Sequence, residues 1–273
     1  MSSFWIKIIA IICMTLDHYN DVIIGHFTFL QVIGRITFPL FCFQLVIGFH
    51  KTKSIPKYLV RLAIFALISQ WPYSLFLETA GMQGGGANVI FTFLIGLVAI
   101  CIYELKLNYE NGQVSISLKN KQKTIQQGIS LSNYKLEKIS LIILKIPIIC
   151  VLLFISNYIK ADYKMWGVLL MLFINIFYPF KDEINIFGDR IKTEKFANIT
   201  LFLIGMFMFS FTKYIENWTT HPLYCIIELV TATFLTSFIM LAYNGKKGPS
   251  IKYFFYIYYP LQFIVLVLLR NVM

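Results

Sequence analysis

The sequence predicts an all-α fold, a polytopic transmembrane helical bundle of about nine spans with its N-terminus inside. Of the 273 residues, 58% are apolar and only 14% are charged, against roughly 45–50% and about 25% in ordinary soluble domains. The mean hydropathy is +0.71, and 26 Phe, 16 Tyr and 4 Trp add more apolar surface than one core of this size can hide from water. The composition therefore argues against a soluble enzyme and places the chain in a lipid bilayer.

Nine segments come close to the roughly 20 mostly apolar residues that a transmembrane helix needs. In chain order they are Phe4–Ile24, Phe27–Phe49, Tyr58–Leu77, Ala87–Leu107, Ile139–Ile159, Ala161–Phe180, Phe196–Ile215, Pro222–Tyr243 and Ile251–Leu269. A tight connection over Ile159–Asp162 is all that separates the fifth segment from the sixth. An arrangement with eight spans, or with a re-entrant segment, therefore stays open.

Lys and Arg are distributed unevenly between the loops. The loops after the second, fourth, sixth and eighth segments hold 16 of the 24 basic residues, and the opposite set holds four. Because cytoplasmic loops retain positive charge during insertion, this bias predicts that the N-terminus is inside and, for an odd number of spans, that the C-terminus is outside. The same bias accounts for the net charge of +11. We therefore expect membrane lipids, and no nucleic acid, as partners.

The chain is expected to form one domain over residues 1–273, with a cytoplasmic insertion at about 108–137. In this polar stretch, the hairpin turn signal Asn111-Gly112 precedes the alternating sequence Val114–Leu118, which predicts a small β-hairpin. The five cysteines all lie in apolar runs and form no C-x-x-C spacing. Neither a disulfide framework nor a metal site is therefore expected.

Two ionisable residues, Asp17 and His18, lie in the outer half of the first segment. A charge at the centre of a span costs about 2.5–3.5 kcal/mol on the insertion scale, so such residues are candidates for function. Because successive residues on a helix diverge by about 100°, Asp17 need not orient His18, whereas Asp21 shares the face of His18 if the helix continues. A histidine near a carboxylate can act as a general base toward an amine or hydroxyl. The alternative is a polar helix end that meets lipid headgroups.

An arginine, Arg35, lies about two turns inside the outer boundary of the second segment. At that depth it needs a counter-charge, for which Asp17 and Asp162 are the candidates at matching height. Its donors could hold a carbonyl or a developing oxyanion, or it could be a structural ion-pair partner only. Pro39, four residues later, can kink this helix and open a cavity beside it.

Further polar residues mark both ends of the predicted bundle. Asn88 and Asp162 begin the fourth and sixth segments at the outer level, where each taken singly is typical of a helix cap or an interface residue. On the inner side, Arg61, Lys246 and Lys247 contribute to a basic surface that could receive an anionic, phosphate-bearing ligand. The alternative is that these residues only reflect the excess of Lys and Arg that cytoplasmic loops carry for topology.

Several short motifs, spread from the first segment to the last, together resemble the TraX family of membrane proteins. They are Met14-x-x-Asp17-His18, Gly34-Arg35-x-x-Phe38-Pro39-Leu40-Phe41, Tyr58-x-x-Arg61-Leu62, Asn88-x-x-Phe91-Thr92, Asp162-Tyr163 and the terminal Tyr-x-x-Tyr-Pro over residues 256–260. The resemblance implies an integral-membrane acetyltransferase, since founding members acetylate the N-terminus of conjugative pilin. It also implies acetyl-CoA as the acyl donor and a multi-pass location in the bacterial inner, cytoplasmic membrane.

One departure from the family pattern bears on the choice of base. The family commonly carries a histidine two residues after the final Tyr-Pro, and this chain has Gln262 there. We therefore assign the base to His18.

The predicted function is transfer of an acetyl group from cytoplasmic acetyl-CoA to an amine or hydroxyl acceptor near the outer face, such as a pilin N-terminus, a surface peptide or a glycan. His18 would be the base, Asp17 or Asp162 would orient it or balance charge, and Arg35 and Asn88 would hold the thioester carbonyl or the oxyanion. Arg61, Lys246 and Lys247 would contact the coenzyme phosphates. Two alternatives are a transporter or permease that uses Asp17, His18 and Arg35 as a proton or substrate site, and a catalytically inert membrane partner.

Overall fold

The computed structural model describes residues 1–26, 28–82, 85–118, 121–127, 130–214, 222–249 and 252–272. It is mostly helical, at 74%. Within these residues five helices are long and apolar enough to cross a membrane, namely Phe29–Lys51, Ile55–Thr79, Asn133–Tyr158, Pro222–Leu241 and Tyr253–Val272. Three shorter apolar helices cover Val89–Glu104, Lys164–Phe177 and Lys195–Phe211.

The chain is thus a helical membrane protein, while the count of nine spans and the inside N-terminus stay predictions. The predicted segment bounds Phe27, Ile215 and Ile251 lie outside the described residues.

The first two predicted segments contain more than two helices. Helix α1 (Ser3–Tyr19) continues into a π-helix, η1 (Asn20–Ile24), and the second segment is divided into α2 (Phe29–Gly34) and α3 (Thr37–Lys51). The break falls at Arg35, four residues before Pro39. A proline has no N–H to donate to the carbonyl four residues back, and its ring clashes with that carbonyl. The distortion expected from Pro39 therefore takes the form of a turn that carries Arg35.

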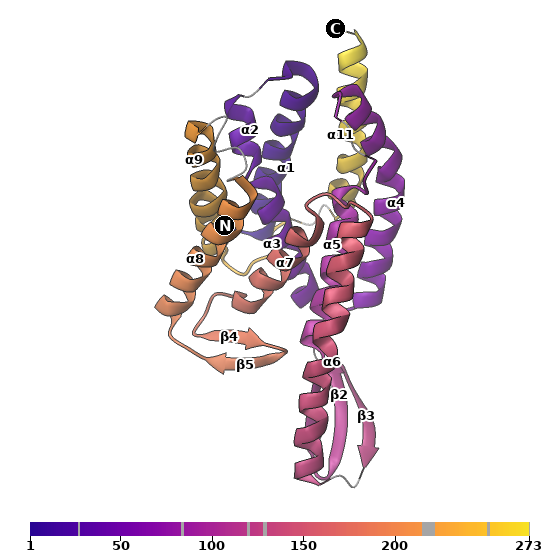
Figure 1. The fold of residues 1–273 in the computed structure, drawn as a ribbon, viewed down its shortest axis with the longest axis vertical. Coiled ribbons are helices and arrows are strands. Elements are labelled where there is room, and N and C mark those ends of the chain that lie inside the picture. The colour runs from indigo at the N-terminus through magenta and orange to yellow at the C-terminus, as the bar shows by residue number, and fades with distance from the viewer. Residues whose placement is uncertain are drawn as a thin grey trace.

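A layer of long helices stands beside this N-terminal group (Figure 1). Helix α4 (Ile55–Thr79) packs against α5 (Val89–Glu104) on one side and against α11 (Lys252–Val272) on the other. Helix α5 in turn packs against α7 (Lys164–Phe177), which also contacts α3. Although α11 contains Pro260, it is one continuous helix. Its direction carries the C-terminus to the end of the molecule opposite the β-strands (Figure 1).

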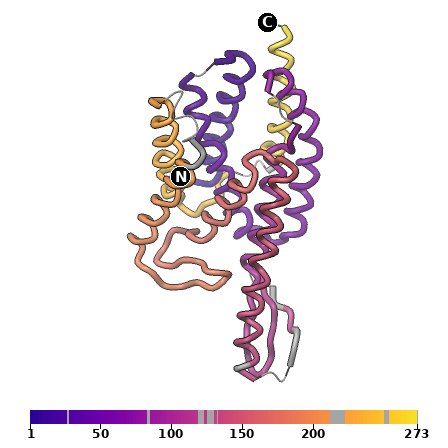
Figure 2. Tube along the Cα trace, viewed as in Figure 1, coloured from indigo at the N-terminus to yellow at the C-terminus, as the bar shows by residue number. Residues whose placement is uncertain are grey.

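The polar insertion forms an antiparallel sheet of β1 (Lys106–Glu110), β2 (Gln113–Leu118) and β3 (Lys121–Gln127). The expected Asn-Gly turn joins β1 to β2, with φ of 50° at Asn111 and 73° at Gly112, so the predicted hairpin is confirmed; β3 extends it. This sheet and the first part of α6 (Leu131–Tyr158) reach beyond the other helices (Figure 2). The Tyr134 hydroxyl ties them together by donating to the Leu107 carbonyl at 3.1 Å.

A second sheet shows that the all-α prediction was too simple. Strands β4 (Glu183–Ile186) and β5 (Asp189–Lys192) pair as an antiparallel hairpin. Its turn is Phe187-Gly188, with φ of 49° and 95°, a two-residue loop whose positive φ values suit glycine. The described residues that follow form α8 (Lys195–Tyr214), α9 (Pro222–Val230), the π-helix η3 (Thr231–Leu235) and α10 (Thr236–Leu241).

The connecting segments gather at two ends of the bundle. At one, which we call the insertion end, the Ser3 N–H donates to the Lys246 carbonyl at 2.9 Å and Lys51 Nζ donates to the Tyr243 hydroxyl at 2.7 Å. At the other, the His18 end, the Asp162 N–H donates to the Ala87 carbonyl at 2.9 Å. The N-terminal residues and the end of the second predicted segment thus meet the loop after the eighth segment at the insertion end, and the loops after the third and fifth segments meet at the His18 end.

Candidate functional site

His18 lies on α1 where that helix faces α4 and α11. Its ring is 5.1 Å from the ring of Phe76 and 4.9 Å from that of Phe263, measured between centroids. Its Nδ1 is 3.1 Å from the side-chain nitrogen of Gln262. His18 makes no other hydrogen bond within the described part of the chain. The half-buried imidazole therefore lies against two apolar rings and is hydrogen-bonded at one nitrogen only among the described residues.

Gln262, the residue that departs from the family pattern, is the polar partner of His18. It is 5% exposed and follows Pro260 by two residues on α11. Its Oε1 is 3.4 Å from Thr15 Oγ1, and Thr15 Oγ1 is 2.7 Å from the Tyr258 hydroxyl. Thr15 and His18 are three apart on α1, and Tyr258 and Gln262 are four apart on α11, so each pair shares one helix face. Two polar faces therefore meet inside the apolar bundle.

Arg35 has a hydrogen-bonded counter-charge that the sequence interpretation did not propose. Its Nε donates to Glu228 Oε1 at 2.7 Å, and the Glu228 side chain is 3% exposed. The side chain of Asp17, one of the two expected partners, interacts electrostatically with Arg35 without forming a hydrogen bond to a described residue. A Cβ atom on Gly34 would overlap the Asp17 carboxyl group, so glycine is required there. Gly34 thus allows α1 to approach α2 closely. Arg35, the next residue, forms its ion pair with Glu228 on α9.

Three carboxyl groups, those of Asp17, Asp21 and Glu228, interact with Arg35, and that of Asp162 lies near Asp17. Asp17 interacts electrostatically with Asp21, Glu228 and Asp162, and Asp21 accepts a hydrogen bond from Gln31 at 3.0 Å. We call Asp17, Asp21, Asp162, Glu228 and Arg35 the charged cluster. Two π-helices of the described residues adjoin it, since η1 contains Asp21 and η3 begins three residues after Glu228. Such π-turns inside helices are frequent at functional sites. Within the described residues, no three His, Cys, Asp or Glu side chains are placed to hold a metal ion.

The side chain of Asn88 forms hydrogen bonds to other residues of the chain. It is the N-cap of α5, where its Oδ1 accepts from the Ile90 N–H at 3.0 Å. Its Nδ2 donates to the Ala66 carbonyl at 2.8 Å and to Gln70 Oε1 at 3.0 Å. Both donors and the acceptor are therefore used, and the side chain is 0% exposed. This arrangement fits the capping alternative for Asn88 and leaves it no donor for a substrate oxygen.

Arg61 lines a basic pocket at the insertion end. The pocket has a volume of about 700 Å³ and lies where α4 and α11 begin, with Lys53, Lys57, Arg61 and Tyr253 in its wall. The Arg61 guanidinium lies over the rings of Tyr58 and Tyr256, with its Cζ 5.8 Å and 5.7 Å from their centroids, while its buried Nε finds no hydrogen-bond partner among the described residues. The residues that line the pocket include no acid.

The predicted companions of Arg61 lie elsewhere. Lys246 and Lys247 are exposed, and their backbone carbonyls accept hydrogen bonds from the Ser3 and Phe4 N–H groups. Neither lysine lines the pocket. The structure instead places Lys53 and Lys57 beside Arg61. The pattern of basic residues four apart, which starts in the loop before α4, could have indicated this from the sequence.

Comparison with known proteins agrees with the motif resemblance. A family model described as TraX protein matches residues 2–270. The chain belongs to the TraX family. A relative described as "Probable fimbrial assembly protein FimC, serogroup H1", from Dichelobacter nodosus, is 25% identical to this TraX protein over 278 residues, which cover 97% of this chain and 94% of the relative. No solved structure matches the chain.

The motifs of this TraX protein touch one another although they are far apart in the sequence. The ring of Phe38 stacks on that of Tyr163, with centroids 3.5 Å apart and an interplanar angle of 3°. Thr92 Oγ1 donates to the Asp162 carbonyl. A Cβ atom on Gly167 would collide with both Thr92 and Phe38. These motif residues therefore form a packed support below the charged cluster.

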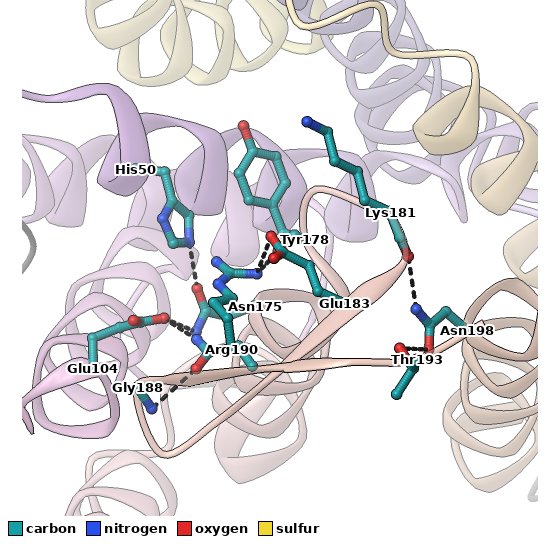
Figure 3. A network of polar contacts seen from close by, with 11 residues as sticks. His50, Glu104, Asn175, Tyr178, Lys181, Glu183, Gly188, Arg190, Thr193 and Asn198 are labelled. Carbon is teal, nitrogen blue, oxygen red and sulfur yellow. Dashed lines mark hydrogen bonds and ion pairs between the residues drawn. The ribbon is translucent and has the colours of Figure 1, made fainter. Parts of the chain in front are cut away.

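A second polar network, at the insertion end, involves a histidine that the sequence interpretation missed (Figure 3). His50 Nε2 is 2.8 Å from Asn175 Oδ1, and Asn175 Nδ2 donates to Glu104 Oε1 at 2.7 Å. Asn185 Nδ2 donates to the same carboxylate oxygen, and Asn185 Oδ1 accepts from the Gly188 N–H at 3.0 Å. We call His50, Asn175, Glu104 and Asn185 the His50 network. It joins α3, α7 and α5 to the β4–β5 hairpin.

Proposed function

We propose that this TraX protein is a membrane acetyltransferase that moves an acetyl group from cytoplasmic acetyl-CoA to an amine or hydroxyl acceptor near the outer face. The observation that carries the proposal is the setting of His18, a histidine inside an apolar helix with two Phe rings against it and Gln262 at one nitrogen. Ionisable groups inside a membrane are costly and mark sites of chemistry or conduction. The family supports the choice of chemistry, because TraX proteins are linked to pilin processing.

In the proposed reaction the acceptor nitrogen or oxygen attacks the thioester carbonyl while His18 removes its proton. The carbon–sulfur bond of the tetrahedral adduct then breaks, coenzyme A leaves as the thiolate, and the proton held by His18 neutralises that thiolate. The products are the acetylated acceptor and free coenzyme A. General base catalysis of this kind typically contributes about 10²–10⁴-fold to a rate.

The charged cluster is assigned the electrostatic part of the reaction. Arg35 is positioned by Glu228 at 2.7 Å, and a guanidinium held in this way can stabilise negative charge on the thioester oxygen. Asp17 balances its charge, in line with the electrostatic attraction between Asp17 and Arg35, and Asp162 adds a second negative charge beside Asp17. We assign Asn88 a positioning role, because its donors are occupied by Ala66 and Gln70.

The basic pocket is the proposed site for the coenzyme phosphates. Lys53, Lys57 and Arg61 supply three cations, and charge-assisted contacts to phosphate are among the stronger hydrogen bonds in proteins. Helix α11 extends from the pocket to His18, since Tyr253 lines the pocket and Gln262, on the same helix, contacts His18. These two residues are nine apart on α11, which corresponds to about 14 Å along the axis. An extended acyl donor along α4 and α11 would connect the two ends.

The proposed acceptor is a pilus or fimbrial subunit in the bacterial inner membrane. The Dichelobacter nodosus relative is described as a probable fimbrial assembly protein, and the free amine at the N-terminus of a subunit is a suitable nucleophile. A surface peptide or glycan would serve the same chemistry.

The test uses isolated membranes supplied with labelled acetyl-CoA and an extract that contains the acceptor. Wild-type membranes should release coenzyme A and label the acceptor, and His18→Ala should lower the rate by about 10²–10⁴-fold. His26→Ala is the matched control, since His26 is an exposed histidine in the loop after η1, where its ring contacts the Ile24 carbonyl. Full activity in His18→Ala, or no release of coenzyme A by the wild type, would refute the proposal.

A transporter is the second candidate, and the charged cluster is the observation that favours it. Five ionisable side chains near one end of a helical bundle can also form a proton or substrate path. This candidate predicts substrate flux across sealed vesicles without turnover of acetyl-CoA. Measuring both quantities in the same vesicles separates the two functions.

A further inference from the structure

The hydrogen bonds around Gln262 bear on how His18 is held. Thr15 Oγ1 is 2.8 Å from the Ile11 carbonyl, 2.7 Å from the Tyr258 hydroxyl and 3.4 Å from Gln262 Oε1. A hydroxyl group has one hydrogen to donate and two lone pairs that accept. The single hydrogen of Thr15 is best used on the Ile11 carbonyl, which accepts only. The Tyr258 hydroxyl then donates to Thr15.

The Thr15 hydroxyl therefore faces Gln262 with a lone pair and with no hydrogen to donate. An amide oxygen facing that lone pair makes no hydrogen bond, whereas an amide nitrogen in the same place donates one. The two ends of a glutamine amide have nearly the same shape, and their orientation is assigned from the hydrogen bonds they can make. A half-turn of the Gln262 amide satisfies both neighbours: its nitrogen donates to Thr15 and its oxygen faces His18 Nδ1, 3.1 Å away.

We propose that Gln262 is a positioning residue that holds neutral His18 in the tautomer with its hydrogen on Nδ1 and its lone pair on Nε2. An oxygen facing Nδ1 requires that hydrogen, and the hydrogen bond made by one ring nitrogen fixes the state of the other. The proposal rests on the proposed function of His18 as the base. It adds that Nε2 is the atom that takes the acceptor's proton.

The arrangement also defines where the proton goes. When the acceptor attacks, Nε2 gains its proton and the Nδ1–H bond to Gln262 stays intact, so the imidazolium is held by the same oxygen. When the thiolate of coenzyme A leaves, it takes the proton from Nε2. His18 thereby returns to the starting tautomer, with no change at Nδ1.

The first measurement is the tautomer itself, by ¹⁵N NMR of detergent-solubilised protein labelled at histidine. The chain has four histidines, and the His18 signals are identified by their loss in His18→Ala. Wild-type His18 should show a protonated Nδ1 and an unprotonated Nε2, and Gln262→Leu should lose this preference. A wild-type His18 with its hydrogen on Nε2 would overturn the proposal, whatever the activity of the protein.

The second measurement separates positioning from packing. Gln262→Leu fills a similar volume without an acceptor and should lower kcat by roughly 10–100-fold, the size of effect known for partners that orient metal-bound histidines, with little change in KM. Gln262→Glu keeps an oxygen toward Nδ1 and should retain most of kcat. Gln44→Leu is the matched control, because Gln44 is also 5% exposed but bonds Ser3, at the opposite end of α1 from His18.

The outcomes distinguish this proposal from the one on which it rests. If Gln262→Leu keeps the wild-type kcat, or if Gln262→Glu loses as much as Gln262→Leu, Gln262 does not position the base. If the wild type transfers no acetyl group, the proposed function fails, and the NMR spectra still decide whether Gln262 sets the tautomer of His18.

Discussion

The two ends of the molecule each contain a histidine among polar partners, and they use it differently. At the insertion end, His50 leads through Asn175 to Glu104, and Glu104 leads through Asn185 to the turn at Gly188. Each link joins a different element, so this network fastens the β4–β5 hairpin to the helices. At the His18 end, the histidine has one hydrogen-bonded partner among the described residues. A network whose polar groups are bonded to one another stabilises the fold. A histidine with one ring nitrogen left for a substrate can act as a base.

The largest expected effect separates these two histidines. His18→Ala should lower the rate of acetyl transfer by about 10²–10⁴-fold, while the variant unfolds at nearly the same temperature as the wild type. His50→Ala should do the reverse, because it opens the His50 network but removes no group from the proposed reaction. Activity per folded molecule and thermal unfolding in detergent measure both effects. Equal losses of activity in the two variants would break the comparison.

The next effect concerns the ion pair of the charged cluster. Glu228→Leu removes the carboxylate that accepts from Arg35 Nε at 2.7 Å, and removing one member of a buried pair typically costs about 3–5 kcal/mol. The double variant Arg35→Met, Glu228→Leu removes both charges and should be more stable than the single variant. Unfolding by a denaturing detergent gives the comparison. A double variant no more stable than Glu228→Leu would show that the pair does not support the fold.

A smaller effect is expected within the His50 network. Asn175 is 0% exposed and bridges His50 to Glu104, so Asn175→Leu leaves buried polar groups unpaired at a cost of about 1–3 kcal/mol. The exposed Asn133 at the start of α6 gives the control, Asn133→Leu. Thermal unfolding should distinguish the two variants, while acetyl transfer per folded molecule stays the same. A loss of kcat in Asn175→Leu would assign chemistry to the insertion end as well.

The smallest effect tests the coenzyme pocket. Lys53→Ala and Lys57→Ala should each raise KM for acetyl-CoA by roughly tenfold, the equivalent of about 1.4 kcal/mol, with kcat little changed. Lys192→Ala, at an exposed lysine of β5, controls for the general loss of charge. Lys246→Ala compares the position favoured by the sequence with the pocket found in the structure. A rise in KM for that variant alone would place the coenzyme at the loop beside the N-terminus.

The ionisable residues at the His18 end were accessible from the sequence because they interrupt apolar segments. Asp17, His18 and Arg35 were found in this way, and the same rule applied to the eighth segment would have found Glu228. The ion pair between Arg35 and Glu228 was not predictable, since it joins residues 193 positions apart and depends on how α2 packs against α9. The contact between Gln262 and His18 required the packing of α1 against α11 for the same reason.

Other features lacked a clear local signal. The Asn111-Gly112 turn predicted the first hairpin, because two successive residues with positive φ favour this dipeptide. The second hairpin has Phe187 at the corresponding place, and its strands of four residues are too short to show a periodic pattern. His50 stands next to Lys51 at the end of a span, where polar residues are ordinary. Only the partners from α5 and α7 show that it is part of a network.

The most direct test of the account uses sealed inside-out membrane vesicles with the acceptor peptide trapped in the lumen and labelled acetyl-CoA added outside. We expect the wild-type protein to label the lumenal peptide and to release an equal amount of coenzyme A outside. His18→Ala should lose both activities, and His50→Ala should lose neither once the rates are corrected for the amount of folded protein. Label on the lumenal peptide that persists in His18→Ala, or coenzyme A release that depends on His50 instead, would contradict the assignment of the chemistry to the His18 end.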